Sequence, residues 1–155
     1  MRNPSPLTEL PAARAGTAAV EFAIVLPVLL LLLGGLVDYG LLIWSKARLA
    51  ASVAQGAQYA FVTGYKVTQA AITSVVQGSS GLTGVAVTIN GPACYCLSGA
   101  PATLTPQVCT TACADGASQN SYVLLSASYT YTPLLPQFAM LLNMQVSEAV
   151  TVRLP

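Results

Sequence analysis

The sequence predicts an α+β protein in which a long N-terminal, transmembrane helix is followed by a small antiparallel sheet domain. Residues 22–44 form an apolar run that contains a single charged residue, Asp38. Three later segments have strand-like patterns, and the first alternates strictly between Val85, Val87 and Ile89 on one face and polar or small residues on the other. Four cysteines gather between positions 94 and 113, which indicates a disulfide-pinned loop in the sheet domain.

The composition excludes several classes of function. Hydrophobic residues make up 54% of the 155 residues and charged residues only 7%, whereas a typical soluble domain has about 25% charged residues. Six basic and five acidic residues give a net charge of +1, so the chain offers no basic face for nucleic acid. Histidine, the commonest general base, is absent. Because phosphate-binding loops and paired carboxylates are also missing, we expect no enzymatic activity and no cofactor.

The apolar run is long enough to cross a bilayer. A transmembrane helix needs about 20 apolar residues, and residues 22–44 meet that length. Tyr39 and Trp44 stand near its far end, and Lys46 and Arg48 follow, which is typical of a membrane boundary. A removed signal peptide would need a small-residue cleavage site soon after the leucines, and none is present. We therefore expect a transmembrane helix over residues 17–46.

The helical pattern continues beyond the apolar run. Small residues recur at spacings of three and four, at Ala47, Ala50, Ala51, Ala54, Ala57 and Ala60. One helix over residues 17–63 would be about 70 Å long. Pro27 and the Gly34-Gly35 pair are expected to bend it or add flexible points. The alanines fit equally well against a neighbouring helix or under the protein's own sheet.

The remaining residues predict the outer domain. A short helix is expected over 67–77, and a strand over 85–90 is expected to close at Asn90-Gly91-Pro92. Residues 94–120 are expected to form a loop, and 133–143 an apolar connector with a helical turn. Two further strands over 122–132 and 145–154 then complete a three-stranded sheet packed on the projecting helix.

The cysteines have two plausible pairings. Cys94 and Cys96 are too close in sequence to pair with each other, so the bonds are either Cys94 with Cys113 and Cys96 with Cys109, or the crossed pairs. A closed loop of about 15 residues contributes roughly 3 kcal/mol. A zinc site is the weaker alternative, because the spacing is not that of a zinc ribbon. Disulfides form in oxidising compartments, which places the outer domain outside the cytoplasm and the N-terminus inside.

Two acids accompany the apolar run. Glu21 lies at its entrance, five residues after Gly16. A charged side chain in a membrane costs up to about 2.5–3.5 kcal/mol, so an isolated one indicates a function. Asp38 lies near the opposite interface, where we expect it to snorkel or to be hydrogen-bonded at headgroup depth.

Residues 16–27 (GTAAVEFAIVLP), followed by the leucine block and Asp38-Tyr39-Gly40, resemble the TadE-like pseudopilins of the tight-adherence (Flp) pilus system. The segment 129–136 (YTYTPLLP) is similar to the end of TadE- and TadG-like chains. The resemblance implies a pilin-like fold and a role as a minor component of pilus assembly. It also implies that a prepilin peptidase removes the leader, residues 1–16, by cutting between Gly16 and Thr17. Glu21 would then face the free amine of a neighbouring subunit.

The resemblance also implies a location and partners. The anchor would lie in the bacterial inner membrane, with residues 47–155 in the periplasm, and the extracellular pilus would be the destination of a subunit that enters the filament. The expected partners are the prepilin peptidase, other pilin and pseudopilin subunits, the inner-membrane pilus machinery and membrane lipid. A different class of protein remains as the alternative: a permanently anchored envelope binding protein whose disulfide-bonded domain recognises a surface.

Overall fold

The computed structural model describes residues 12–100, 102–114, 116, 119–142 and 144–155. It confirms the α+β class, with a long apolar helix followed by a small antiparallel sheet and two disulfides. The predicted leader falls mostly on residues 1–11, outside the described residues. The elements are α1 (Ala12–Thr63), a 3-10 turn (Gly64–Lys66), α2 (Gln69–Ser80), β1 (Ala86–Ser98), β2 (Thr103–Pro106), β3 (Asn120–Thr130), a second 3-10 turn (Pro136–Phe138), α3 (Ala139–Leu142) and β4 (Gln145–Arg153).

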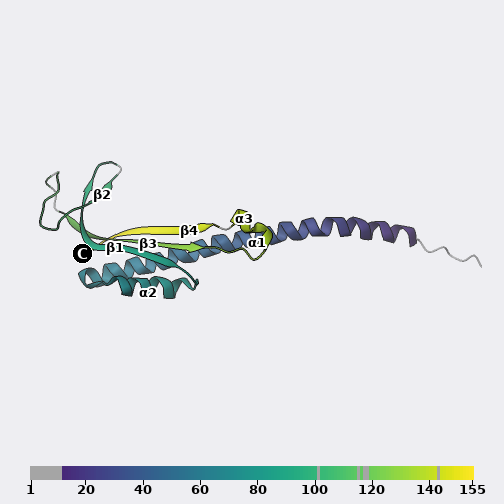
Figure 1. The fold of residues 1–155 in the computed structure, drawn as a ribbon, viewed down its shortest axis with the longest axis horizontal. Coiled ribbons are helices and arrows are strands. Elements are labelled where there is room, and N and C mark those ends of the chain that lie inside the picture. Colours follow the sequence, from purple (N-terminus) through teal and green to yellow (C-terminus); the bar gives the residue numbers. More distant parts are fainter. Residues whose placement is uncertain (1–11, 101, 115, 117–118, 143) are drawn as a thin grey trace, which may run out of the picture.

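Helix α1 is the axis of the molecule. Its C-terminal half packs against the sheet and α2, whereas its N-terminal half projects alone (Figure 1). The helix runs through Pro27 without a break and ends at Thr63, as the sequence predicts. Proline has no amide hydrogen, so one backbone hydrogen bond of the helix is absent at this position. Pro27 is therefore accommodated inside a continuous helix.

The sheet has four antiparallel strands in the order β2-β1-β3-β4, so the prediction of three strands is wrong. The predicted loop contains the additional strand β2, and β1 continues past Asn90-Gly91-Pro92 to Ser98. A register shift between Asn90 and Ala93 absorbs the interruption. Gly91 makes this possible, because its φ is +113° and a Cβ there would lie 2.5 Å from the Tyr122 carbonyl oxygen.

Helix α2 has clear signals at both ends. The Thr68 side chain accepts a hydrogen bond from the Ala71 amide at 3.3 Å, which caps the N-terminus. The helix continues to Ser80, beyond the predicted end at residue 77, because the left-handed residue that stops it is Gly81 (φ +59°) and not Gly78.

The core lies where α1, α2 and the sheet meet. Its large buried side chains come from all three elements and include Leu49, Val53, Ile72, Val76, Val123 and Leu125. The two interpretations of the alanine series are thereby separated. Ala57 and Ala60 lie under the protein's own domain, whereas Ala47, Ala50, Ala51 and Ala54 are exposed on the outer face of α1.

Gly56 brings α1 close to the core. A Cβ at this position would lie 2.6 Å from Val76 Cγ2 and 3.0 Å from Leu125 Cδ2, and both side chains are fully buried. We expect Gly56→Ala to lower the free energy of unfolding by about 1–3 kcal/mol through overpacking. Denaturant titration of the full chain in detergent micelles, followed by circular dichroism, measures this. Gly40→Ala is the control, since nothing lies within 4 Å of its Cβ position. Equal effects of the two substitutions would contradict the prediction.

Candidate functional site

The predicted processing segment lies on the free N-terminal half of α1. Gly16 and Thr17 are within the helix, four and five residues after its first residue, and Glu21 follows one turn later on the same face. All three residues are exposed, and a Cβ at Gly16 would meet nothing within 4 Å. The fold therefore leaves both sides of the bond between Gly16 and Thr17 uncovered.

The residues that follow are apolar and unpacked. Within residues 16–66, α1 is long and apolar enough to span a membrane by its length and composition. Its leucine block, residues 29–33, is exposed, with between 45% and 68% of each side chain accessible. A helix that is apolar on every side needs an apolar environment around it, so this half is suited to lipid or to a bundle of like helices.

Asp38 is the most buried charged residue among those described, with 1% of its surface exposed. Its Oδ1 accepts hydrogen bonds from the Tyr131 hydroxyl at 3.1 Å and from the Leu134 amide at 2.8 Å. Its Oδ2 accepts a third, from the Leu135 amide at 3.2 Å. One carboxylate on α1 thus holds the end of β3 and the start of the connector that leads to β4.

Proline and glycine residues shape this contact on both sides. Pro133 and Pro136 flank Leu134 and Leu135, whose amides reach Asp38. Because proline has no amide hydrogen, the two leucines between the prolines donate both hydrogen bonds. On α1, a Cβ at Gly34 would collide with the Leu135 side chain, and one at Gly35 would lie 3.2 Å from Phe138 Cζ. These close contacts show what packs on Gly34-Gly35, while the flexibility expected of the pair stays a prediction. The pair is a docking surface in a continuous helix.

The Asp38 contact works by hydrogen bonding without a cation. The ion pair found among the described residues joins Lys46 Nζ to Glu148 Oε1 at 3.8 Å and does not involve Asp38. A buried charge needs partners that replace water, and the three donors fill this role. Burial, and then the Asp38 carboxylate, raise the pKa of Tyr131 above its ordinary value. Tyr131 therefore stays protonated and donates.

Of the two states expected for Asp38, snorkelling or hydrogen bonding, the structure shows hydrogen bonding, with partners that the sequence did not indicate. They lie 93 to 97 positions further along the chain. A signal was present, because the two sequence segments that resemble the TadE-like pattern, around Asp38 and at residues 129–136, are the two that meet here.

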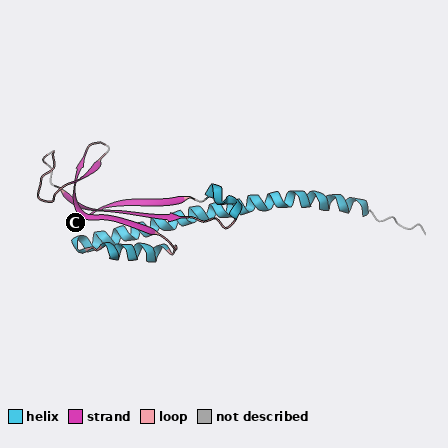
Figure 2. Ribbon diagram, in the orientation of Figure 1, coloured by secondary structure: helices cyan, strands magenta, loops and turns pink. Residues whose placement is uncertain are grey.

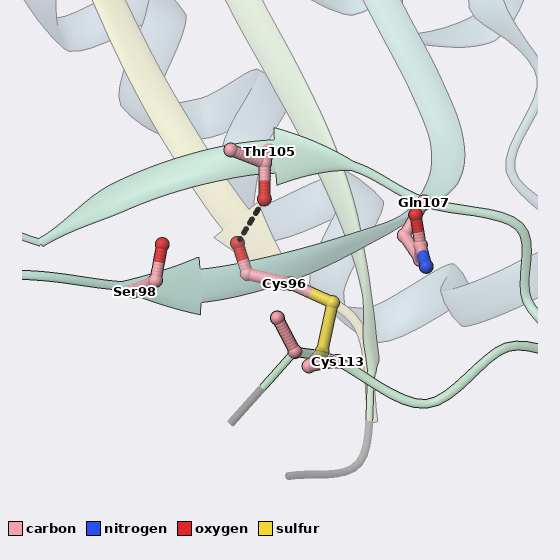
Figure 3. Close-up of a pocket in the computed structure, with 6 residues that line it drawn as sticks. Cys96, Ser98, Thr105, Gln107 and Cys113 are labelled. Atoms are coloured by element: carbon pink, nitrogen blue, oxygen red, sulfur yellow. Dashed lines mark hydrogen bonds between the residues drawn. A yellow bond between two sulfur atoms is a disulfide. The ribbon is translucent and has the colours of Figure 1, made fainter. Parts of the chain in front are cut away.

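The disulfides close the opposite end of the domain. Cys94 pairs with Cys109 and Cys96 with Cys113, which is the crossed arrangement. Figure 3 shows the second bond beside a hollow of about 380 Å³, where Thr105 Oγ1 donates to the Cys96 carbonyl oxygen at 3.4 Å. The other polar groups there belong to Ser98 and Gln107. No titratable side chain occurs among these lining residues, so they supply no acid or base.

A long apolar helix, bare over its N-terminal half and joined to a disulfide-bonded antiparallel sheet, makes the chain an α+β protein. Residues 16–58 match the family model described as TadE-like protein. The resemblance is thus confirmed over the segment that carries Gly16, Thr17, Glu21 and Asp38, and it associates the chain with tight-adherence pilus assembly. No curated protein and no solved structure matches the chain significantly.

Proposed function

We propose that this chain is a minor pilin or pseudopilin of the tight-adherence (Flp, type IVb) pilus. It acts as a membrane-anchored structural component of pilus assembly, without catalytic activity, after a prepilin peptidase has cut between Gly16 and Thr17. The observation that carries the proposal is the TadE-like match, which begins at Gly16 and covers the exposed apolar half of α1.

The geometry suits this processing step. The bond between Gly16 and Thr17 lies inside α1, so a peptidase has to unwind the first helical residues before the backbone can enter its active site. Glycine costs a helix about 1 kcal/mol relative to alanine, which eases the unwinding. It also carries no Cβ that would obstruct the approach of the enzyme.

Processing gives Glu21 a partner. The new N-terminus at Thr17 carries an ammonium group, and a carboxylate and an ammonium paired in hydrocarbon cost far less than two separate charges. Glu21 is exposed on α1, where the helix of a neighbouring subunit can bring its own N-terminus. The pair would set the register between subunits.

The proposed location follows from the same features. The apolar half of α1 crosses the bacterial inner membrane, the N-terminus faces the cytoplasm, and the sheet domain lies in the periplasm, where the two disulfides are stable. The partners are the prepilin peptidase, other pilin subunits and the inner-membrane machinery. The extracellular pilus is the destination of any subunit that is incorporated.

Mass spectrometry of the membrane-extracted protein tests the proposal. In a strain with the peptidase we expect a chain that begins at Thr17, and in a strain without it a chain that begins at Met1. Gly16→Val should prevent cleavage, while Gly40→Val, at an open position of the same helix, should not. An intact Met1 in the presence of the peptidase, or a fragment that begins near Ser52, would favour the permanently anchored envelope binding protein instead.

A further inference from the structure

The connector between β3 and β4 exposes an unusual amount of apolar surface. Residues 131–147 contain no charged side chain. We call its most exposed apolar side chains the connector surface; they are Leu134 (68% exposed), Met140 (99%), Leu141 (73%) and Met144 (52%). Exposed apolar side chains gathered on one short segment mark a binding surface on a folded protein.

The connector surface borders the free half of α1. Leu135 and Phe138 pack on Gly34 and Gly35, and Asp38 holds the connector at that level of the helix. Figure 2 shows the short helix of the connector at the end of the sheet from which the bare helix projects. A groove of about 350 Å³ between the two segments is lined mainly by leucines, namely Leu30, Leu33, Leu134 and Leu135, with Gly34, Val37 and Asp38. The connector surface and the apolar surface of α1 are thus continuous.

We propose that the connector surface contacts phospholipid at the outer interface of the bilayer, so that the hydrocarbon-spanning segment is residues 17–37 rather than 22–44. This rests on the membrane anchoring in the proposed function. At 1.5 Å per residue, the 21 residues 17–37 span about 31 Å, which matches a hydrocarbon core of about 30 Å. The domain then sits on the membrane through its own apolar side chains.

The backbone of the connector favours this placement. If the core reached Trp44, the level of Gly34 to Asp38 would lie about 9–15 Å inside it. The connector's irregular backbone would then be in hydrocarbon, where each unpaired polar group costs several kcal/mol. In the placement proposed here, Tyr39 and Trp44, each 54% exposed, lie at headgroup level.

The charges point to lipid as the occupant. Lys46 is the first charged residue after Asp38, and its side chain is 62% exposed and paired with Glu148. Lys46 lies eight residues past Asp38 on α1 and Glu148 is the fourth residue of β4, so both follow the connector in the direction of the disulfide end. At the other end, the boundary falls at the bond between Gly16 and Thr17, and Glu21 lies four residues, or about 6 Å, inside the core.

Spin labelling of the full chain in phosphatidylcholine and phosphatidylglycerol vesicles tests the proposal. The native cysteines are all in disulfides, so a new cysteine at Met140 (M140C) is the labelling site. Leu32→Cys is the control for the hydrocarbon core and Val62→Cys, at an 84% exposed position on the far end of α1, is the control for water. We expect the ratio of accessibility to oxygen over a water-soluble nickel chelate to be severalfold higher at 140 than at 62.

The outcomes are distinct. A label at 140 that behaves like the one at 62, while the label at 32 is in lipid, overturns the connector proposal and leaves the anchor intact. A label at 32 in water overturns the anchor and with it the proposed function. A label at 140 shielded from both reagents shows a protein cover, such as a second copy, and also overturns the connector proposal. Leu141→Cys, 73% exposed, serves as the second labelling site should M140C misfold.

Discussion

Asp38→Ala is expected to lower the free energy of unfolding of the sheet domain by about 3 kcal/mol, because it leaves buried donors without their charged acceptor. The Tyr131 hydroxyl and the amides of Leu134 and Leu135 lose their partner together. A domain has about 5–15 kcal/mol of stability in total, so this is a large fraction. Denaturant titration of the full chain in detergent micelles, read by circular dichroism, measures the loss.

Two further variants separate the contributions of the individual hydrogen bonds to Asp38. Tyr131→Phe removes one donor and leaves the amides in place, so its effect should be about 1 kcal/mol. Asp38→Asn keeps the shape of the side chain but loses its charge, so its loss of unfolding free energy should lie between those of Tyr131→Phe and Asp38→Ala. Hydrogen exchange at the amides of Leu134 and Leu135 should accelerate in Asp38→Ala and stay slow in Tyr131→Phe. If Asp38→Ala is no worse than Tyr131→Phe, the carboxylate does not hold the connector.

Glu21→Ala is expected to remain in the membrane and to be cut at Thr17, yet to reduce pilus assembly by more than about tenfold. The reason is that breaking a buried charge pair costs about 3–5 kcal/mol, and each 1.4 kcal/mol is a factor of ten. This prediction rests on the proposed function. Counting surface pili by electron microscopy, with N-terminal mass analysis of the same cells, separates the assembly defect from a processing defect.

The neighbouring position supplies the control. Val20 is 61% exposed on the same turn of α1, so Val20→Ala removes a similar apolar surface without touching the charge and should assemble normally. Glu21→Gln should reduce pilus assembly as much as Glu21→Ala does, because it also lacks the charge. Glu21→Asp keeps the charge and should retain part of the pilus assembly. Normal pili in Glu21→Ala cells would count against a role in register.

The local patterns predicted most of the elements. The helical spacing of small residues up to Gly64 predicted that α1 ends at Thr63. The strand-like patterns predicted the main part of three of the strands. The motif around Gly16 and Glu21 pointed to the TadE-like resemblance, and the family model matches that part of the chain, residues 16–58. These features depend on periodicity and on neighbours in the chain, which a sequence displays directly.

Contacts between distant segments escaped that reasoning. The sequence left two cysteine pairings open and did not show that Leu135 and Phe138 pack on Gly34-Gly35. It also did not reveal β2, whose four residues lie in a segment rich in proline, serine and threonine. Each of these features depends on what packs opposite. A strand of four residues has little pattern of its own, and a glycine that admits a leucine side chain looks like any other glycine in the sequence.

The apolar helix with a glycine and an acid at its entrance can be read from the amino-acid order alone, because the hydropathy and spacing of adjacent residues are local properties. The position of the outer domain on that helix becomes visible only in the folded chain. The fold brings Asp38 together with amides more than 90 positions away and lays an apolar connector beside Gly34 and Gly35. The physical reason is that a buried carboxylate needs donors, and only the folded chain shows which ones reach it.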